Sequence, residues 1–126
     1  MKKVFLGSLF LVFLNGFSAQ AGTLDPQKVI YCRANNESGN WMITIAPQPG
    51  GNYTVNNIAA GQNLAGSGSQ LELETLGFFC HGANASVNLT TGEGTVDFKY
   101  NSGFLGGGCQ RMRGTLSLCN NTAWPQ

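Results

Sequence analysis

Cys80 and His81 stand side by side, and His81 is the only histidine of the chain. A cysteine thiolate with a histidine as its base is a nucleophile, so this pair is the first candidate for catalysis. Neighbouring residues of a strand point to opposite faces of a sheet, however, which would turn the two side chains apart. The sequence therefore favours Cys80 as half of a disulfide and His81 as a separate candidate binding residue.

Two hydrolytic alternatives have little support. A Ser–His–Asp triad would combine His81 with a serine and with Asp25 or Asp97, but the chain lacks the Gly-x-Ser-x-Gly turn that exposes a nucleophilic serine. Glu72 and Glu74 lie two residues apart, about 6.5–7 Å along a strand, and paired carboxylates hydrolyse glycosides. Their alternation with leucines predicts a solvent-facing row instead. We assign no catalytic residue and keep a small secreted hydrolase as an alternative function.

The sequence contains few of the residues and motifs that bind metal ions or cofactors. The chain has one histidine, no C-x-x-C pair and no calcium loop of the D-x-[DN]-x-[DN]-G type. We therefore expect neither a metal ion nor a cofactor.

Surface recognition is the remaining chemistry. Arg111 and Arg113 share the outward face of the last predicted strand, and the rigid donor fork of arginine suits an anion or a carboxylate. Trp124 lies in the C-terminal tail, and aromatic residues are favoured at contact sites. Alternatively, the arginines only keep the strand surface soluble, and Trp124 covers an open end of the β-structure instead of contacting a partner. We take Arg111, Arg113, Trp124 and His81 as candidate binding residues.

The N-terminal residues predict export. Lys2 and Lys3 precede an apolar run over 4–14, and the A-x-A motif at 19–21 is typical of a signal peptidase site. The run is shorter than the ~20 residues that span a bilayer. We expect a cleaved signal peptide over 1–21 and one domain over 22–126 without a membrane anchor, secreted or periplasmic, in a bacterial cell.

The charge of the predicted mature domain argues against nucleic acid as a partner. The chain has seven Lys and Arg, of which two lie in the signal segment, so five remain against six Asp and Glu. A nucleic-acid-binding surface needs a cluster of basic residues to neutralise phosphates. An extracytoplasmic protein, a glycan or a small ligand fits this balance better.

Alternating apolar residues predict an all-β domain. Short alternating runs occupy 41–46, 53–55, 71–74 and 87–100, and turns rich in Gly and Asn separate them, as at 49–51 and 91–94. We expect about 7–9 short antiparallel strands in a β-sandwich or a β-barrel, and the pattern does not choose between the two. The segment 59–70 has few charges and is expected to be a long loop.

The four cysteines, an even number in an exported chain, predict two disulfides. If 109–119 is one straight strand, Cys109 and Cys119 lie about 30 Å apart and cannot pair. The bridges are then Cys32–Cys119 with Cys80–Cys109, or Cys32–Cys109 with Cys80–Cys119. A hairpin centred on Gly114 would instead give Cys109–Cys119 and Cys32–Cys80. The unbroken alternation favours the straight strand, with Leu118 on the face of Met112 and Cys119 on the face of Arg111.

These observations predict a small exported binding module with an inhibitor-like or adhesive role. A structural subunit of a surface assembly, held by pairing of strand edges, is a second alternative.

Overall fold

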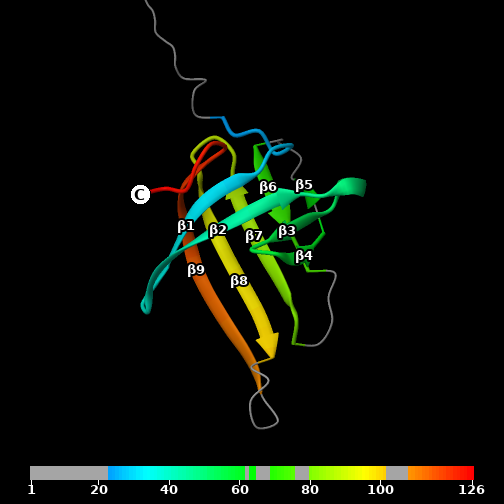
Figure 1. Ribbon diagram of the computed structural model, residues 1–126, viewed down its shortest axis with the longest axis vertical. Coiled ribbons are helices and arrows are strands. Elements are labelled where there is room, and N and C mark those ends of the chain that lie inside the picture. Colours follow the sequence, from blue (N-terminus) through cyan, green and yellow to red (C-terminus); the bar gives the residue numbers. More distant parts are fainter. Residues whose placement is uncertain (1–22, 62, 65–68, 76–79, 102–107) are drawn as a thin grey trace, which may run out of the picture.

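The computed structural model describes residues 23–61, 63–64, 69–75, 80–101 and 108–126. The predicted signal peptide lies outside the described residues. Within them, nine strands form one antiparallel sheet (Figure 1). The strands are β1 (Ile30–Asn36), β2 (Gly39–Pro47), β3 (Tyr53–Val55), β4 (Ile58–Ala60), β5 (Asn63–Leu64), β6 (Gln70–Leu73), β7 (Gly82–Asn88), β8 (Glu93–Asn101) and β9 (Cys109–Asn120).

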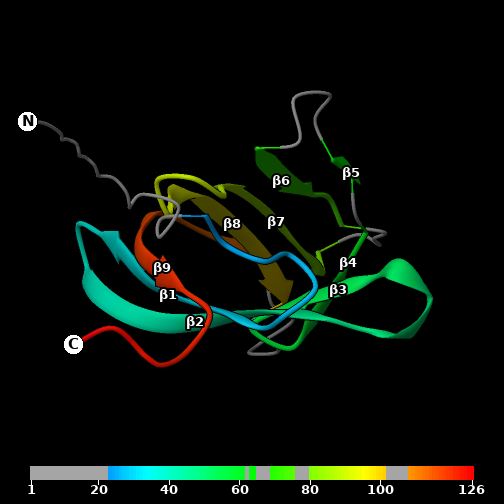
Figure 2. The same cartoon turned by 90° about the horizontal axis from the view of Figure 1, so that it is seen from above.

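The sheet curls into a nearly closed barrel. Its strand order is β4-β3-β2-β1-β9-β8-β7-β6-β5, and its first strand, β4, packs beside β7 near the other end of the order. One backbone hydrogen bond links the two ends directly, because Gly61 N–H donates to the carbonyl of Glu74 at 2.6 Å. Figure 2 looks down on the resulting ring of strands. The all-β prediction is confirmed, and of its two architectures the structure adopts the barrel-like one.

The core follows from the period of two along each strand. Side chains that point inward are almost fully buried, while their neighbours in sequence lie on the outer face. Short hairpins with matching registers keep these inward residues at the same level in neighbouring strands. The largest buried side chains are Ile30, Ile43, Ile45, Leu71, Leu73, Leu116, Val55 and Val87.

Two predicted turns are present. Pro49–Gly51 joins β2 to β3, with Gly50 and Gly51 at positive φ, where a side chain would be strained. The turn between β7 and β8 was expected at 91–94 but lies earlier, between Asn88 and Glu93. The amide oxygen of Asn88 accepts hydrogen bonds from the N–H groups of Thr90 and Thr91, which ends β7 at that residue.

The expected long loop over 59–70 is wrong for much of its length. Ala59 and Ala60 belong to β4, Asn63–Leu64 forms β5, and Gln70 begins β6. Residues 62 and 65–68 lie outside the described residues. The small uncharged residues of this segment show no alternation of apolar and polar types. They form strands because β4 pairs with β3 and β5 pairs with β6.

The segment 23–29 covers one end of the barrel, as Figure 2 shows. Leu24 is buried, and its N–H donates to the carbonyl of Leu89 at 2.7 Å. The Tyr53 hydroxyl donates to the carbonyl of Pro26. The N-terminal segment therefore covers this end, and the alternative role of Trp124 as a cap over an open end stays a prediction.

Two disulfides, Cys32–Cys119 and Cys80–Cys109, join the strands. They are the first of the two pairings expected from a straight strand, and β9 does run unbroken over twelve residues. The hairpin centred on Gly114, with its Cys109–Cys119 bridge, is wrong. Two disulfides are consistent with an extracytoplasmic protein.

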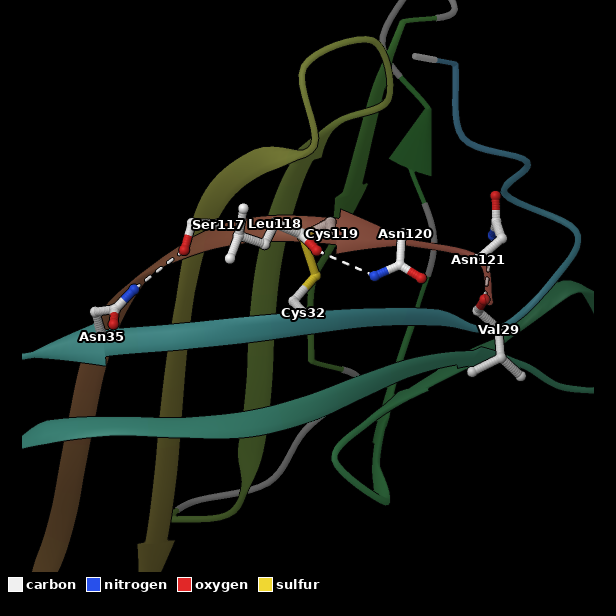
Figure 3. The surroundings of a disulfide bond; sticks show 8 residues. All are labelled: Val29, Cys32, Asn35, Ser117, Leu118, Cys119, Asn120 and Asn121. Atoms are coloured by element: carbon white, nitrogen blue, oxygen red, sulfur yellow. Dashed lines mark hydrogen bonds between the residues drawn. A yellow bond between two sulfur atoms is a disulfide. The ribbon is translucent and has the colours of Figure 1, made fainter. Parts of the chain in front are cut away.

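The alternation predicted for the end of β9 is also wrong. Between the partner pairs Arg33–Ser117 and Tyr31–Asn120 the register shifts by one residue, which is a β-bulge. Leu118 has φ 54° and is 57% exposed, whereas Cys119 is buried. Figure 3 shows Leu118 pointing away from the sheet while the disulfide of Cys119 reaches Cys32 on β1.

Candidate binding surfaces

The outer face carries a row of polar side chains that crosses five strands. Strand pairing places these residues directly opposite one another in the order Glu72, Ser86, Thr95, Thr115 and Asn35. Neighbouring strands are about 4.8 Å apart, so the row spans roughly 19 Å. We call it the polar row.

Two grooves lie along this row, on either side of β8, and share Thr95 and Asp97 as a common wall. The first, of about 340 Å³, is lined by Glu72, Glu74 and Asn84 on the β6–β7 side. The second, of about 490 Å³, is lined by Asn35, Glu37, Arg113 and Thr115 on the β9–β1 side. The first groove is therefore acidic, and the second has groups of both charges.

Asp97, which lines both grooves, forms an ion pair with Arg111. The Arg111 guanidinium donates to Asp97 from Nη2 at 2.7 Å and from Nε to both carboxylate oxygens at 3.1 and 3.2 Å. Arg113 Nε lies 3.7 Å from the same carboxylate. The hydrogen bond from Arg111 lowers the pKa of Asp97 below its usual value. Asp97 is thus an anionic acceptor and is unsuited to the role of general acid.

A second surface lies farther along the outer face of β1, β2 and β9. Trp124 is 43% exposed and meets Tyr31 edge-to-face, with ring centroids 5.1 Å apart. Leu118 is 57% exposed and Met42 is 40% exposed. We call the set Tyr31, Arg33, Met42, Leu118 and Trp124 the aromatic surface.

Asparagines hold Trp124 in place. The side-chain amide of Asn121 donates to the carbonyls of Asp25 and Val29, and its oxygen accepts the N–H of Asp25. The side-chain oxygen of Asn120 accepts hydrogen bonds from the N–H groups of Thr122 and Ala123, forming a turn after β9. The tail is therefore tied to the N-terminal segment, and the indole is positioned before any partner arrives.

Arg33 stands within this surface without a charged partner. It lies opposite Met42 on β2 and Ser117 on β9, and no ion pair involves it within the described residues. Its Nε is shielded from solvent and has no hydrogen-bond partner there. A partly buried cation beside apolar side chains favours a carboxylate on whatever covers it.

The four predicted binding residues do not converge on one site. Arg111 and Arg113 point outward beside the grooves, whereas Trp124 follows the far end of β9, about 30 Å away at ~3.3 Å per residue from Arg111 to Asn120. His81 is exposed and directly precedes Gly82 of β7. Gly82 pairs with Lys99 on β8, and Lys99 pairs with Arg111 on β9. His81 is thus at the arginine end of the sheet.

Sequence reasoning missed most of the aromatic surface and the polar row. Arg33 and Met42 are sequence neighbours of the buried Cys32 and Ile43, so strand alternation alone predicts that they lie on the outer face. The exposure of Leu118 had no such signal, because it depends on the bulge. Thr95 and Thr115 become neighbours only through the register of β8 and β9.

The disulfide of Cys80 excludes the candidate Cys80–His81 nucleophile. A disulfide-bonded sulfur supplies no thiolate, and Cys80 is buried whereas His81 is exposed. Among the residues that the structure describes, no three His, Cys, Asp or Glu side chains gather as a metal ion requires. In the same part of the chain, no helix is long and apolar enough to cross a membrane.

Comparisons with protein families, with curated proteins and with solved structures find no significant match to this chain.

Proposed function

We propose that the chain is an exported protein-binding module, secreted or periplasmic in a bacterial cell, whose partner covers the aromatic surface. The observation that carries the proposal is Trp124, which meets the Tyr31 ring and is 43% exposed. Arg33 lies on the same strand as Tyr31 and has no ion-pair partner among the described residues. Tyr, Trp, Arg and Met are the residues enriched at the centres of protein interfaces. The signal-like residues 1–21 and the two disulfides support export.

The chemistry of the surface specifies the partner. Three exposed apolar side chains, those of Met42, Leu118 and Trp124, need apolar contacts, whereas Arg33 needs an anion. The partner is therefore a folded protein that presents a carboxylate next to aliphatic or aromatic side chains. Because the indole and the bulge are positioned in advance, little conformational entropy is lost on binding.

The test uses the secreted chain as bait in the extracytoplasmic fraction of its source, followed by titration of the purified partner. Trp124→Ala and Arg33→Met should each weaken binding by about tenfold or more, which is ~1.4 kcal/mol. Arg33→Met keeps an unbranched apolar side chain and removes the guanidinium with its charge and hydrogen-bond donors. Tyr100→Ala, which alters another exposed aromatic residue at the arginine end of the sheet, is the control and should bind normally.

Two results would contradict the proposal. One is a captured protein whose affinity is the same for the wild type, Trp124→Ala and Arg33→Met. The other is concentration-dependent self-association in sedimentation experiments with no captured protein, which is the behaviour of a structural subunit.

A further inference from the structure

The groove between β8, β9 and the end of β1 is lined in part by small groups that both donate and accept hydrogen bonds. Thr95 lies opposite Thr115, and Thr115 lies opposite Asn35, so two hydroxyls and one amide line up across three strands. The groove has a volume of about 490 Å³, within the usual range of about 300–1,000 Å³ for ligand sites.

The charges at the rim of this groove balance. The charge of Asp97 is offset by its ion pair with Arg111, so Arg113 and Glu37 remain, one of each sign. Arg113 reaches Asp97 only at 3.7 Å and is 66% exposed, so its guanidinium is available to a ligand. A ligand with a large net charge of either sign would meet one matching and one opposing group.

Hydroxyl groups are the ligand chemistry that fits both observations. A sugar hydroxyl donates and accepts hydrogen bonds, as do the threonine hydroxyls and the asparagine amide. The carboxylate of Asp97 can accept from one hydroxyl of a neighbouring pair, and the fork of Arg113 can donate to two oxygens. No aromatic side chain is among the described residues that line the groove.

We propose that this groove binds a neutral segment of a carbohydrate chain through the polar row. The absence of an aromatic platform among the lining residues gives weak binding, in the millimolar range, through hydrogen bonds alone. The groove lies next to the aromatic surface. Asn35 of the groove donates a hydrogen bond to Ser117, and Ser117 pairs with Arg33 of the aromatic surface. The groove does not depend on that surface, so the two proposals can fail separately.

The first test is a titration of the ¹⁵N-labelled mature chain, residues 22–126, with three neutral trisaccharides: cellotriose, maltotriose and chitotriose. At about 10 mM sugar, above a millimolar dissociation constant, at least one should shift the amide signals of Thr95, Thr115 and Asn35. The signals of Tyr31 and Trp124 should stay in place. No shift at the groove with any of the three sugars overturns the proposal, as do shifts confined to Tyr31 and Trp124.

Charged peptides test the competing ligand class. Trilysine and triglutamate are added to the same sample, and neither should shift the groove signals as strongly as the best sugar. If one of them does so while the sugars do not, the groove binds charged peptide and the carbohydrate proposal is wrong.

Matched variants then locate the contact. Thr95→Val and Thr115→Val keep the branched shape of the side chain and remove one hydroxyl, so each should weaken the best sugar by about threefold to tenfold. Thr54→Val removes an outward hydroxyl of β3, away from the groove, and should leave binding unchanged. Equal losses in all three variants would contradict the assignment of the site.

Discussion

Leu118 and Cys119, neighbours in β9, have exchanged the faces that strict alternation from Met112 assigns to them. The extra residue of the bulge lies between the partners of Tyr31 and Arg33, so Cys119 turns inward to Cys32 while Leu118 turns out to solvent. One irregularity in a twelve-residue strand therefore forms a buried disulfide and exposes an apolar residue at the same time.

The bulge predicts opposite effects for two substitutions of Leu118. Its φ of 54° lies in the left-handed region, which costs a residue such as leucine about 1–2 kcal/mol and which asparagine adopts more readily. Leu118→Asn should therefore raise the free energy of unfolding by up to ~1 kcal/mol. Leu118→Val, branched at Cβ, should lower it by about 1 kcal/mol. Urea denaturation measures both, and equal changes in the two variants would contradict the bulge.

The two disulfides should differ in what their removal costs. Cys32–Cys119 closes a loop of 87 residues, and the loop-entropy relation gives a stabilisation of about 4.6 kcal/mol. Cys80–Cys109 closes a loop of 29 residues, for which the stabilisation is about 3.6 kcal/mol. Cys32 is also fully buried, whereas Cys109 is exposed. The variant with Cys32→Ala and Cys119→Ala should thus be the less stable of the two pairwise variants in urea denaturation. The reverse order would show that strain or residual structure outweighs loop length.

Acid should weaken the fold partly through Asp97. The hydrogen bond from Arg111 lowers the pKa of this carboxyl from its usual 3.8, so the folded state binds the Asp97 proton less readily than the unfolded state does. The stabilisation is complete above about pH 5, where the carboxyl is ionised in both the folded and the unfolded state. It is lost as the pH falls below 3.8 through the lowered folded-state pKa.

Carbon-13 NMR of the Asp97 carboxyl checks this prediction. In Arg111→Gln the titration should move back toward higher pH, while Lys99→Gln, which removes a cation without a hydrogen bond to Asp97, should move it less. The same midpoint in the wild type and in Arg111→Gln would contradict the ion pair. Because both partners are partly exposed, added salt should also reduce the difference.

Much of the fold was accessible from the sequence because burial imposes alternation on strands. Runs such as 41–46 could be assigned from their apolar residues alone, and the straight reading of 109–119 restricted the disulfide pairings. The short strands β4 and β5 could not be assigned, since their residues are strands through pairing with β3 and β6 and not through their own preference. The choice of a barrel depended on contacts between distant strands, namely the packing of β4 beside β7 and the hydrogen bond from Gly61 to Glu74.

The surfaces were less accessible, because a site on a sheet depends on register between strands. Arg111 and Arg113 could be placed on one face, since they share a strand. That Asp97 would lie opposite Arg113, and Thr95 opposite Thr115, follows only from the pairing of β8 with β9. Trp124 was identified by type, but its position on Tyr31 depends on side-chain hydrogen bonds that no periodicity encodes.

Those hydrogen bonds make Asn121 the residue that positions Trp124. Asn121→Ala removes three hydrogen bonds between the tail and the N-terminal segment, namely two to Asp25 and one to Val29. We expect a loss of about 1–3 kcal/mol in the free energy of unfolding. The nuclear Overhauser contacts between the Trp124 and Tyr31 rings should also weaken, because the indole leaves its position.

Asn52→Ala, at an exposed asparagine of the β2–β3 turn, is the matched control and should leave both quantities nearly unchanged. Partner binding separates positioning from contact, because the Asn121 side chain is hydrogen-bonded to Asp25 and Val29 of the N-terminal segment. Asn121→Ala should weaken binding less than Trp124→Ala, and adding it to Trp124→Ala should cause little further loss, since there is then no indole to position. If the two losses add in full, Asn121 contacts the partner itself and the tail needs no anchoring.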